Sequence, residues 1–137
     1  MAESPVHELR VALTVEAYAQ ALEFYRDALG LPVLEEWDDP GAQGAVLDAG
    51  RATLEILSAG QAARVDEIEV GQRVAGPVRL ALEVDDSAAV AADLVAAGGE
   101  LLAEPVVTPW SDRNVRVRAP DGMQLTLFTV LERESFT

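Results

Sequence analysis

Two short stretches of this chain share one alternating pattern of apolar and polar residues. Residues 9–15 read Leu-Arg-Val-Ala-Leu-Thr-Val, and residues 78–84 read Val-Arg-Leu-Ala-Leu-Glu-Val. Strict alternation is typical of a β-strand that presents two different faces. In each stretch one face is apolar, and the other carries an arginine, Arg10 or Arg79, followed by an alanine. The repeat therefore predicts two equivalent strands whose polar faces leave room for other groups.

The segments that follow each of these strands repeat in the same order. Apolar residues spaced by three and four over residues 16–29 predict an amphipathic helix, which Gly30 ends. After the second strand, Asp85-Asp86-Ser87 offers side chains that cap the N-terminus of another helix. These features predict the fold class α+β, with two βαβββ modules. The further strands are expected at residues 33–37, 45–48, 52–57, 100–107, 115–118 and 123–130.

The modules are expected at residues 8–58 and 78–130, within a single domain that spans residues 1–137. The segment 59–77 between them is polar, contains three glycines and lacks a strand pattern. It is interpreted as a linker with at most a short helical turn at residues 62–67. Residues 1–7 and 131–137 are interpreted as loose tails.

The period of two also predicts which side chains share a face. If Leu54 and Ile56 lie on the helix-covered face of their strand, Glu55 points the other way. If Leu125 and Leu127 lie on the covered face of the last strand, the opposite face carries Gln124, Thr126 and Phe128. We therefore expect the polar faces of the two modules to meet around one cavity. Its predicted lining is Arg10, Glu55, Arg79, Thr126 and Phe128.

Composition narrows the range of functions. The chain has no cysteine, no lysine and a formal net charge of −14, which disfavours disulfides and binding to nucleic acid. It contains neither an apolar run long enough to span a membrane nor a recognisable signal peptide, so a cytoplasmic location is expected. The acidity is interpreted as a source of solubility, and attraction for cationic small molecules is the alternative.

Three motifs carry a resemblance to a known family. They are the helix segment from Phe24 to Leu31, the pattern Gly-Arg-x-x-Leu-Glu-Ile at residues 50–56, and Pro-Asp-Gly at residues 120–122. Together with the repeat, they resemble the vicinal oxygen chelate superfamily, which includes glyoxalase I, bleomycin-resistance proteins and extradiol dioxygenases. The resemblance covers about residues 8–130 and implies mixed sheets that form a cavity, a small-molecule ligand and a homodimer.

The resemblance also implies where a metal ion would bind. Enzymes of this superfamily typically hold a divalent metal with two histidines and two carboxylates, and these positions fall on Arg10, Glu55, Arg79 and Thr126. Only Glu55 matches, and a guanidinium cannot ligate a metal because it has no free lone pair. The only histidine, His7, lies three residues before the ligand position. We therefore expect neither a metal nor another cofactor.

Two interpretations of the remaining charges stay open. Arg10, Glu55 and Arg79 either neutralise one another as a structural cluster, or leave one arginine free to bind a ligand oxygen. Trp110, in a loop at residues 108–113, and Phe128 are candidates to contact a planar ligand. Trp37 is expected to pack against loop backbone instead.

Three functions are compatible with these residues. The first is a metal-free protein that sequesters a small molecule, such as an aromatic antibiotic or natural product. Its pocket would be lined by Arg10, Glu55, Arg79, Trp110 and Phe128. The second is a metal-independent lyase or isomerase in which Glu55 acts as the base. The third is a regulatory or structural module whose cavity is closed by the charged cluster.

Overall fold

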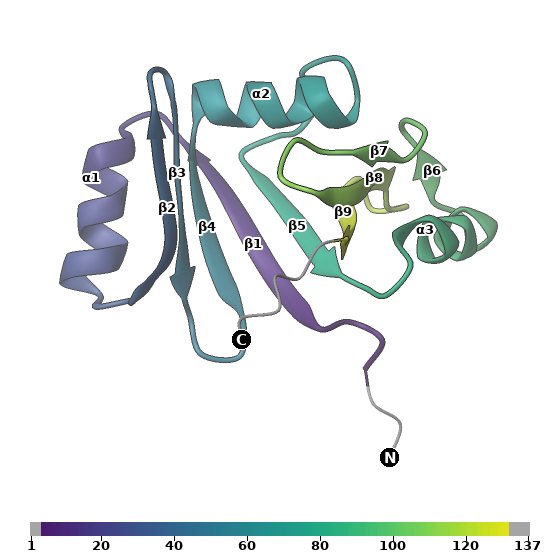
Figure 1. The fold of residues 1–137 in the computed structure, drawn as a ribbon, viewed down its shortest axis with the longest axis horizontal. Coiled ribbons are helices and arrows are strands. Elements are labelled where there is room, and N and C mark those ends of the chain that lie inside the picture. Colours follow the sequence, from purple (N-terminus) through teal and green to yellow (C-terminus); the bar gives the residue numbers. More distant parts are fainter. Residues whose placement is uncertain (1–3, 132–137) are drawn as a thin grey trace.

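The β-strands of the computed structural model, which describes residues 4–131, form one mixed sheet. The order along the sheet is β2-β3-β4-β1-β5-β9-β8-β6, and the short β7 pairs with β8 (Figure 1). Within each half, the first strand is parallel to the last and the other neighbours are antiparallel. The predicted α+β class and the repeated strand order are confirmed.

The elements of the first half follow the predicted order closely. Strand β1 is followed by a helix that continues as a π-helical turn. This turn ends at Ala28, and Gly30, two residues beyond it, has a φ of +86°. A left-handed conformation of this kind suits glycine because it has no Cβ. The bounds are β1 Glu8–Val15, α1 Tyr18–Leu22, η1 Glu23–Ala28, β2 Val33–Asp39, β3 Ala42–Asp48 and β4 Thr53–Ser58.

The second half repeats this order with a more irregular third segment. Asp86 caps helix α3 as predicted, because its carboxylate accepts a hydrogen bond from the Ala89 amide. The segment predicted as one strand at residues 100–107 is two short strands, β6 and β7, and this prediction was wrong. The bounds are β5 Val78–Glu83, α3 Ser87–Ala96, β6 Glu100–Leu101, β7 Val106–Val107, β8 Asp112–Arg118 and β9 Gln124–Val130.

The two halves join through the repeated strands. Strands β1 and β5 pair in antiparallel fashion, and Arg10 lies opposite Ala81 while Ala12 lies opposite Arg79. Each arginine therefore has a buried alanine as its cross-strand neighbour, which leaves the inner face uncrowded. The halves thus pair within one chain, and their polar faces meet where the sequence pattern predicts.

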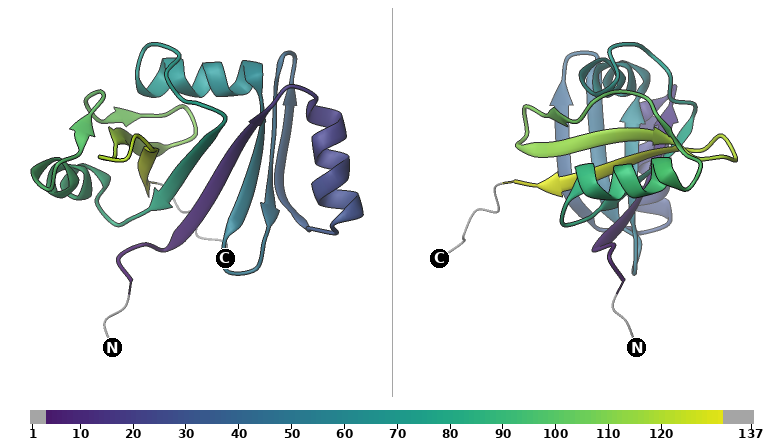
Figure 2. Two further views of the ribbon diagram at one scale, coloured as in Figure 1. Left: turned by 180° about the vertical axis from the view of Figure 1, so that it is seen from behind. Right: turned by 90° about the vertical axis from the view of Figure 1, so that its right-hand side faces the viewer.

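The apolar faces form two separate cores on the outer sides of the sheet. Helix α1 packs Tyr18 and Leu22 on the first half, and Val84 and Ala91 belong to the core beneath α3 on the second half. In Figure 2 these two helices flank the sheet at opposite ends of the molecule. Because the helices cover the outer faces, the inner faces of both halves remain available to line a shared space.

Helix α2, Ala59–Glu69, lies in the segment interpreted as a linker, and the prediction of only a short helical turn was wrong. Ser58 caps this helix by accepting a hydrogen bond from the Gln61 amide. The helix crosses from β3 and β4 of one half to β8 of the other (Figures 1 and 2). The segment between the modules therefore connects both halves, while the module boundaries themselves stay a prediction.

The structure also corrects the interpretation of two terminal and loop segments. Val6 packs against the second core and the His7 ring bonds to the Asp85 carboxylate at 2.6 Å, so the described part of residues 1–7 is not a loose tail. Strand β8 begins at Asp112, inside the segment predicted as a loop. Residues 1–3 and 132–137 of the predicted tails lie outside the described residues. Within residues 4–131, no helix is long and apolar enough to cross a membrane.

The packing of α2 gives a direct test of the fold. A Cβ atom at Gly60 would overlap the carbonyl oxygen of Gly41 in the β2–β3 turn, whereas a Cβ at Gly76 would meet no atom within 4 Å. We expect Gly60→Ala to lower the free energy of unfolding by about 1–3 kcal/mol, because backbone must move to admit the methyl group. Gly76→Ala is the control, and urea unfolding measures both. Equal stability of the two variants would contradict this packing.

Candidate ligand site between the two modules

A cavity of about 530 Å³ lies between the inner faces of the two halves. Its lining comes from strands β1, β4, β5, β8 and β9, from β2 at one side and from α2. All six side chains predicted to bind a ligand are found there. They are Arg10, Glu55, Arg79, Trp110, Thr126 and Phe128.

Glu55 lies between the two arginines at the centre of this lining. Its two carboxylate oxygens are 3.7 Å from Nη1 of Arg10 and 3.8 Å from Nη2 of Arg79. Burial raises the pKa of Glu55 above its ordinary value, and the two guanidinium groups offset only part of this effect. The separations are those of ion pairs without direct hydrogen bonds. The three groups that the repeat predicted to converge are therefore together.

Both arginines also have other partners within the protein. Arg10 donates hydrogen bonds from Nε and Nη2 to Glu8 at 3.2 and 3.0 Å, and its guanidinium lies 5.4 Å from the centre of the Phe128 ring. Arg79 donates from Nη1 to the Thr126 hydroxyl at 2.9 Å. Glu8 was missed by the sequence analysis, although its place two residues before Arg10 on one strand predicts the same face. The geometry favours the structural-cluster interpretation of the arginines.

The Thr126 hydroxyl links this cluster to a second, deeper group of charges. It accepts hydrogen bonds from Arg79 and from Nε of Arg116, at 2.9 and 3.2 Å, and donates one to Glu69 at 3.0 Å. A hydroxyl has one proton and two lone pairs, so these three bonds use its full capacity. Thr126 therefore fixes the position of Arg79 relative to Glu69.

Arg116 is the centre of the deeper group and is fully buried. Its guanidinium bonds to Asp66 at 2.8 Å and to Glu69 at 2.8 and 3.1 Å, and both carboxylates come from helix α2. Burial acts to raise the pKa of Asp66, but hydrogen bonds from the Ala75 amide, Arg116 and Arg73 hold it below its ordinary value. Sequence reasoning missed this group. The available signal was the run of polar residues at alternate positions of β8.

Aromatic side chains occupy three places on the cavity wall. Phe128 is buried beneath Arg10, while Trp110 is 43% exposed. Trp37 was predicted to pack against loop backbone, but it lies on β2, lines the cavity and covers Gly44, so this prediction was wrong. The wall thus combines ionised groups with rings that offer apolar faces.

Asp112 is a further charged residue of the lining that the sequence analysis did not select. Burial raises its pKa to about 6, which Arg10 and the Trp110 side chain oppose and Glu83 and Glu35 reinforce. Among residues 4–131, no group of three or more histidine, aspartate or glutamate side chains is arranged to hold a metal ion.

The buried network around Arg116 predicts a large difference between two arginines of β8. Arg116→Met is expected to lower the free energy of unfolding by about 3–5 kcal/mol, because Glu69 loses its charge partner while it remains buried. Arg118→Met is the matched control, since Arg118 and Glu100 form a 3.0 Å ion pair that is largely exposed. Chemical denaturation of both variants measures the difference. Similar losses below about 1 kcal/mol would show that the network does not stabilise the fold.

The raised pKa of Asp112 predicts a dependence of stability on pH. The folded protein holds this proton more tightly than the unfolded chain, in which the aspartate pKa is about 3.9. The ionised carboxylate therefore costs stability above about pH 6, and the cost shrinks as the pH falls toward 3.9. Asp112→Asn is expected to stabilise the protein by about 1 kcal/mol at about pH 8 and by less at about pH 5. If the stabilisation by Asp112→Asn grew as the pH falls, the result would contradict a raised pKa for Asp112.

Comparison with known proteins agrees with this architecture. The Streptomyces coelicolor methylmalonyl-CoA epimerase, in complex with 2-nitronate-propionyl-CoA, is similar in structure with a TM-score of 0.66 and 23% identity, over 96% of this chain and 99% of that chain. The methylmalonyl-CoA epimerase of Mycobacterium tuberculosis is similar with a TM-score of 0.65 and 21% identity, over 94% and 91%.

Another similar structure is a glyoxalase/bleomycin resistance protein/dioxygenase superfamily member from Vibrio splendidus, with a TM-score of 0.61 and 14% identity, over 89% of this chain and 97% of that chain. These identities support a shared fold and not a shared activity. No curated protein matches the chain. The sequence profile of the Glyoxalase/Bleomycin resistance protein/Dioxygenase superfamily matches residues 9–127. The chain therefore belongs to this superfamily.

Proposed function

We propose that this protein binds a small organic molecule in the cavity between its modules and acts by stoichiometric capture. The observation that carries the proposal is a cavity of about 530 Å³ whose wall combines aromatic rings with charged groups held by the protein itself. This volume lies within the range of about 300–1,000 Å³ that is usual for small-molecule sites. The rings of Trp37, Trp110 and Phe128 favour a ligand with a planar apolar part, such as an aromatic antibiotic or natural product.

The state of the charged groups favours binding over chemistry. Arg10 and Arg79 already donate hydrogen bonds to Glu8 and Thr126, so an oxyanion on a substrate would have to compete with these partners. Phe128 is covered by a guanidinium, which fixes that part of the wall. A preformed wall of this kind supplies affinity, but its guanidinium groups are already engaged and do not wait for a developing oxyanion.

A divalent metal of the kind found in many superfamily enzymes does not fit the residues at this position. Two of the four ligand positions carry guanidinium groups, which lie within 4 Å of the one carboxylate, and the fourth carries a hydroxyl. The hydroxyl of Thr126 is saturated by its three hydrogen bonds. The donor set is therefore incomplete for Zn²⁺ or Fe²⁺, which take about three imidazole or carboxylate ligands.

The same proposal includes a homodimer in the cytoplasm. A symmetric dimer would present two equivalent cavities and would not require a new site. Size-exclusion chromatography with light scattering tests the oligomeric state independently of the ligand.

A metal-independent lyase or isomerase is the second candidate, because one observation favours it. Glu55 is a buried carboxyl with a raised pKa beside two cations, and a general base is often tuned in this way. The similar structures include methylmalonyl-CoA epimerases. If the protein were such an enzyme, it would exchange a carbon-bound proton of an acyl thioester with solvent deuterium. This exchange would disappear in Glu55→Gln.

A thermal-shift screen over aromatic natural products, acyl thioesters and small dicarboxylates tests capture. A ligand present at a hundred times its Kd adds about 2.7 kcal/mol of stability, which raises Tm measurably. For a ligand found in this way, Trp110→Ala is expected to weaken binding about tenfold, because a partly exposed ring on the wall is lost. Val107→Ala, which removes another exposed apolar side chain outside the cavity, is the control.

The same ligand separates the two candidates. In the capture function, Glu55→Gln keeps most of the affinity and mass spectrometry recovers the ligand unchanged. If the native chain converts the ligand to a product and Glu55→Gln does not, the protein is an enzyme and the capture function is wrong. Equal affinities of Trp110→Ala, Val107→Ala and the native chain would place the ligand outside this cavity.

A further inference from the structure

We propose that Trp37 limits the size of the planar apolar group that the cavity admits. This inference rests on the proposed function, because it concerns the specificity of the same cavity. Three observations carry it: the close packing of the Trp37 indole on Gly44, the small buried residues behind the ring, and the charged groups that line the neighbouring part of the wall.

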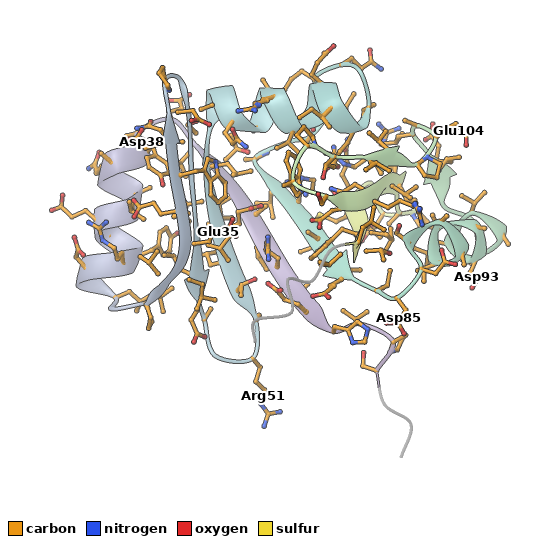
Figure 3. All side chains as sticks on the ribbon, in the orientation of Figure 1. Glu35, Asp38, Arg51, Asp85, Asp93 and Glu104 are labelled. Carbon is orange, nitrogen blue, oxygen red and sulfur yellow. The ribbon has the colours of Figure 1, made fainter. Side chains whose placement is uncertain are left out.

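The alternation of strand β2 directs Trp37 toward the cavity. Glu35 lies in the space between the halves, whereas Asp38 lies on the side of α1 (Figure 3). Trp37 shares the face of Glu35, because side chains two residues apart on a strand point the same way, and both residues line the cavity. Across the sheet, Trp37 is directly opposite Gly44 of β3. The indole therefore belongs to the inner face of the first module.

The indole lies so close to Gly44 that no larger residue fits beneath it. A Cβ atom at Gly44 would overlap the ring at Cζ2, Cε2 and Nε1 of Trp37. The backbone itself does not require glycine, because Gly44 is not among the glycines with a positive φ. A glycine within a strand weakens that strand and often marks a close approach of another group. The position of the ring therefore accounts for glycine at this point of β3.

The residues behind the ring are small and come from several elements. Trp37 packs against a buried cluster that consists of Ala12 on β1, Leu57 on β4 and Ala62 on α2. Leu57 lines the cavity together with Trp37, whereas the two alanines and Gly44 do not. The indole therefore fills a recess between the sheet and α2, bounded by Gly44 and this cluster, and separates that recess from the open cavity.

Packing alone holds the ring in the recess. Nε1 of Trp37 is buried and has no hydrogen-bond partner among residues 4–131. A buried indole N–H usually donates to an acceptor, so here the shape of the recess, and not a hydrogen bond, sets the position of the ring. An aromatic hydrocarbon has no donor to satisfy. It would therefore fit the recess if Trp37 were removed.

The equivalent position of the second module is polar. Asn114 of β8 has the register position that Gly44 has on β3, because each is paired with the residue two places after Thr126 or Glu55. The Asn114 side chain donates a hydrogen bond to Glu69 of α2 at 2.7 Å. Polar groups thus meet where the first module has an aromatic ring. We therefore expect the planar apolar part of a ligand to lie at the first module.

The wall beside the recess is unfavourable for a larger apolar group. Glu35 precedes Trp37 by two residues on β2, and Glu55 lies at the centre of the wall between two guanidinium groups. An apolar ring placed among these groups would displace their water without offering hydrogen bonds, which costs free energy. The part of the cavity that suits an apolar group is therefore smaller than its total volume of about 530 Å³, and the indole sets its inner limit.

Two neutral alcohols of different ring size test the inference. Naphthylmethanol carries two fused rings and pyrenylmethanol carries four. The native chain is expected to bind naphthylmethanol about tenfold more tightly than pyrenylmethanol. Trp37→Ala removes a bicyclic ring, so the recess can then admit the two additional rings, and the affinity for pyrenylmethanol is expected to rise about tenfold. Equilibrium dialysis measures both affinities.

Trp110→Ala is the matched control. Trp110 is the other tryptophan of the chain and also lines the cavity, but it is 43% exposed and does not belong to the cluster behind Trp37. Its removal is expected to weaken the binding of both alcohols alike, because a ring face is lost and no recess is opened. The ratio of the two affinities should therefore stay that of the native chain.

Gly44→Ala tests the same contact without removing the ring. The new methyl group would push the indole from the recess toward the cavity, so the affinity for naphthylmethanol is expected to fall about tenfold. In the double variant Gly44→Ala/Trp37→Ala this overlap is gone, and both alcohols are expected to bind nearly as they do to Trp37→Ala. If the ring were only structural, these variants would change Tm and leave the ratio of the two affinities unchanged.

The outcomes distinguish this inference from the function on which it rests. If the native chain binds both alcohols equally, or if Trp37→Ala and Trp110→Ala leave the same ratio, the size limit is wrong and capture in the cavity stands. If Trp37→Ala does not fold, as judged by circular dichroism, Gly44→Ala decides: an unchanged affinity for naphthylmethanol overturns the inference. If neither alcohol binds to the native chain or to Trp37→Ala, the inference is contradicted, and the thermal-shift screen tests capture independently.

Discussion

Charges buried between the two modules set the geometry of the whole site. Arg116 holds Asp66 and Glu69 of helix α2, Thr126 bonds to Arg116, Glu69 and Arg79, and Arg79 faces Glu55. Each buried charge requires an opposite charge nearby, since the cost of an unpaired ion in the interior is several kcal/mol. The helix between the modules, the two central strands and the cavity wall are therefore positioned by one connected set of ionic and hydrogen-bonding contacts.

The sequence predicted the parts of this arrangement that follow from strand periodicity. The repeat placed Arg10 and Arg79 on equivalent strands, and alternation turned Glu55 and Thr126 toward them, because a change of face would expose the apolar residues between. The full length of helix α2 escaped prediction because three of its five buried residues are polar. Contacts with segments distant in the sequence bury Gln61, Asp66 and Glu69. The local sequence pattern does not predict this burial, because these residues do not form an apolar stripe. Trp37 was misplaced for a related reason: its strand extends to the turn at Pro40-Gly41.

Membership of the superfamily and the groups on the inner faces of its two modules together support the proposed function. The fold supplies a concave surface between two modules, and the groups on that surface decide what it binds. Here two guanidinium groups stand where the resemblance implies imidazoles, and the surrounding carboxylates outnumber them. A wall of this composition suits binding of an organic ligand by charge, hydrogen bonds and ring contacts, which is the basis of the proposed capture.

We propose that arginines occupy the positions of this cavity at which the resemblance implies metal ligands. Elemental analysis of the native protein, purified without chelators and then dialysed, tests the claim most directly. We expect transition metal well below one ion per chain, and no further uptake when Zn²⁺, Ni²⁺ or Mn²⁺ is added. One tightly held ion per chain, lost when Glu55 is replaced by glutamine, would contradict it.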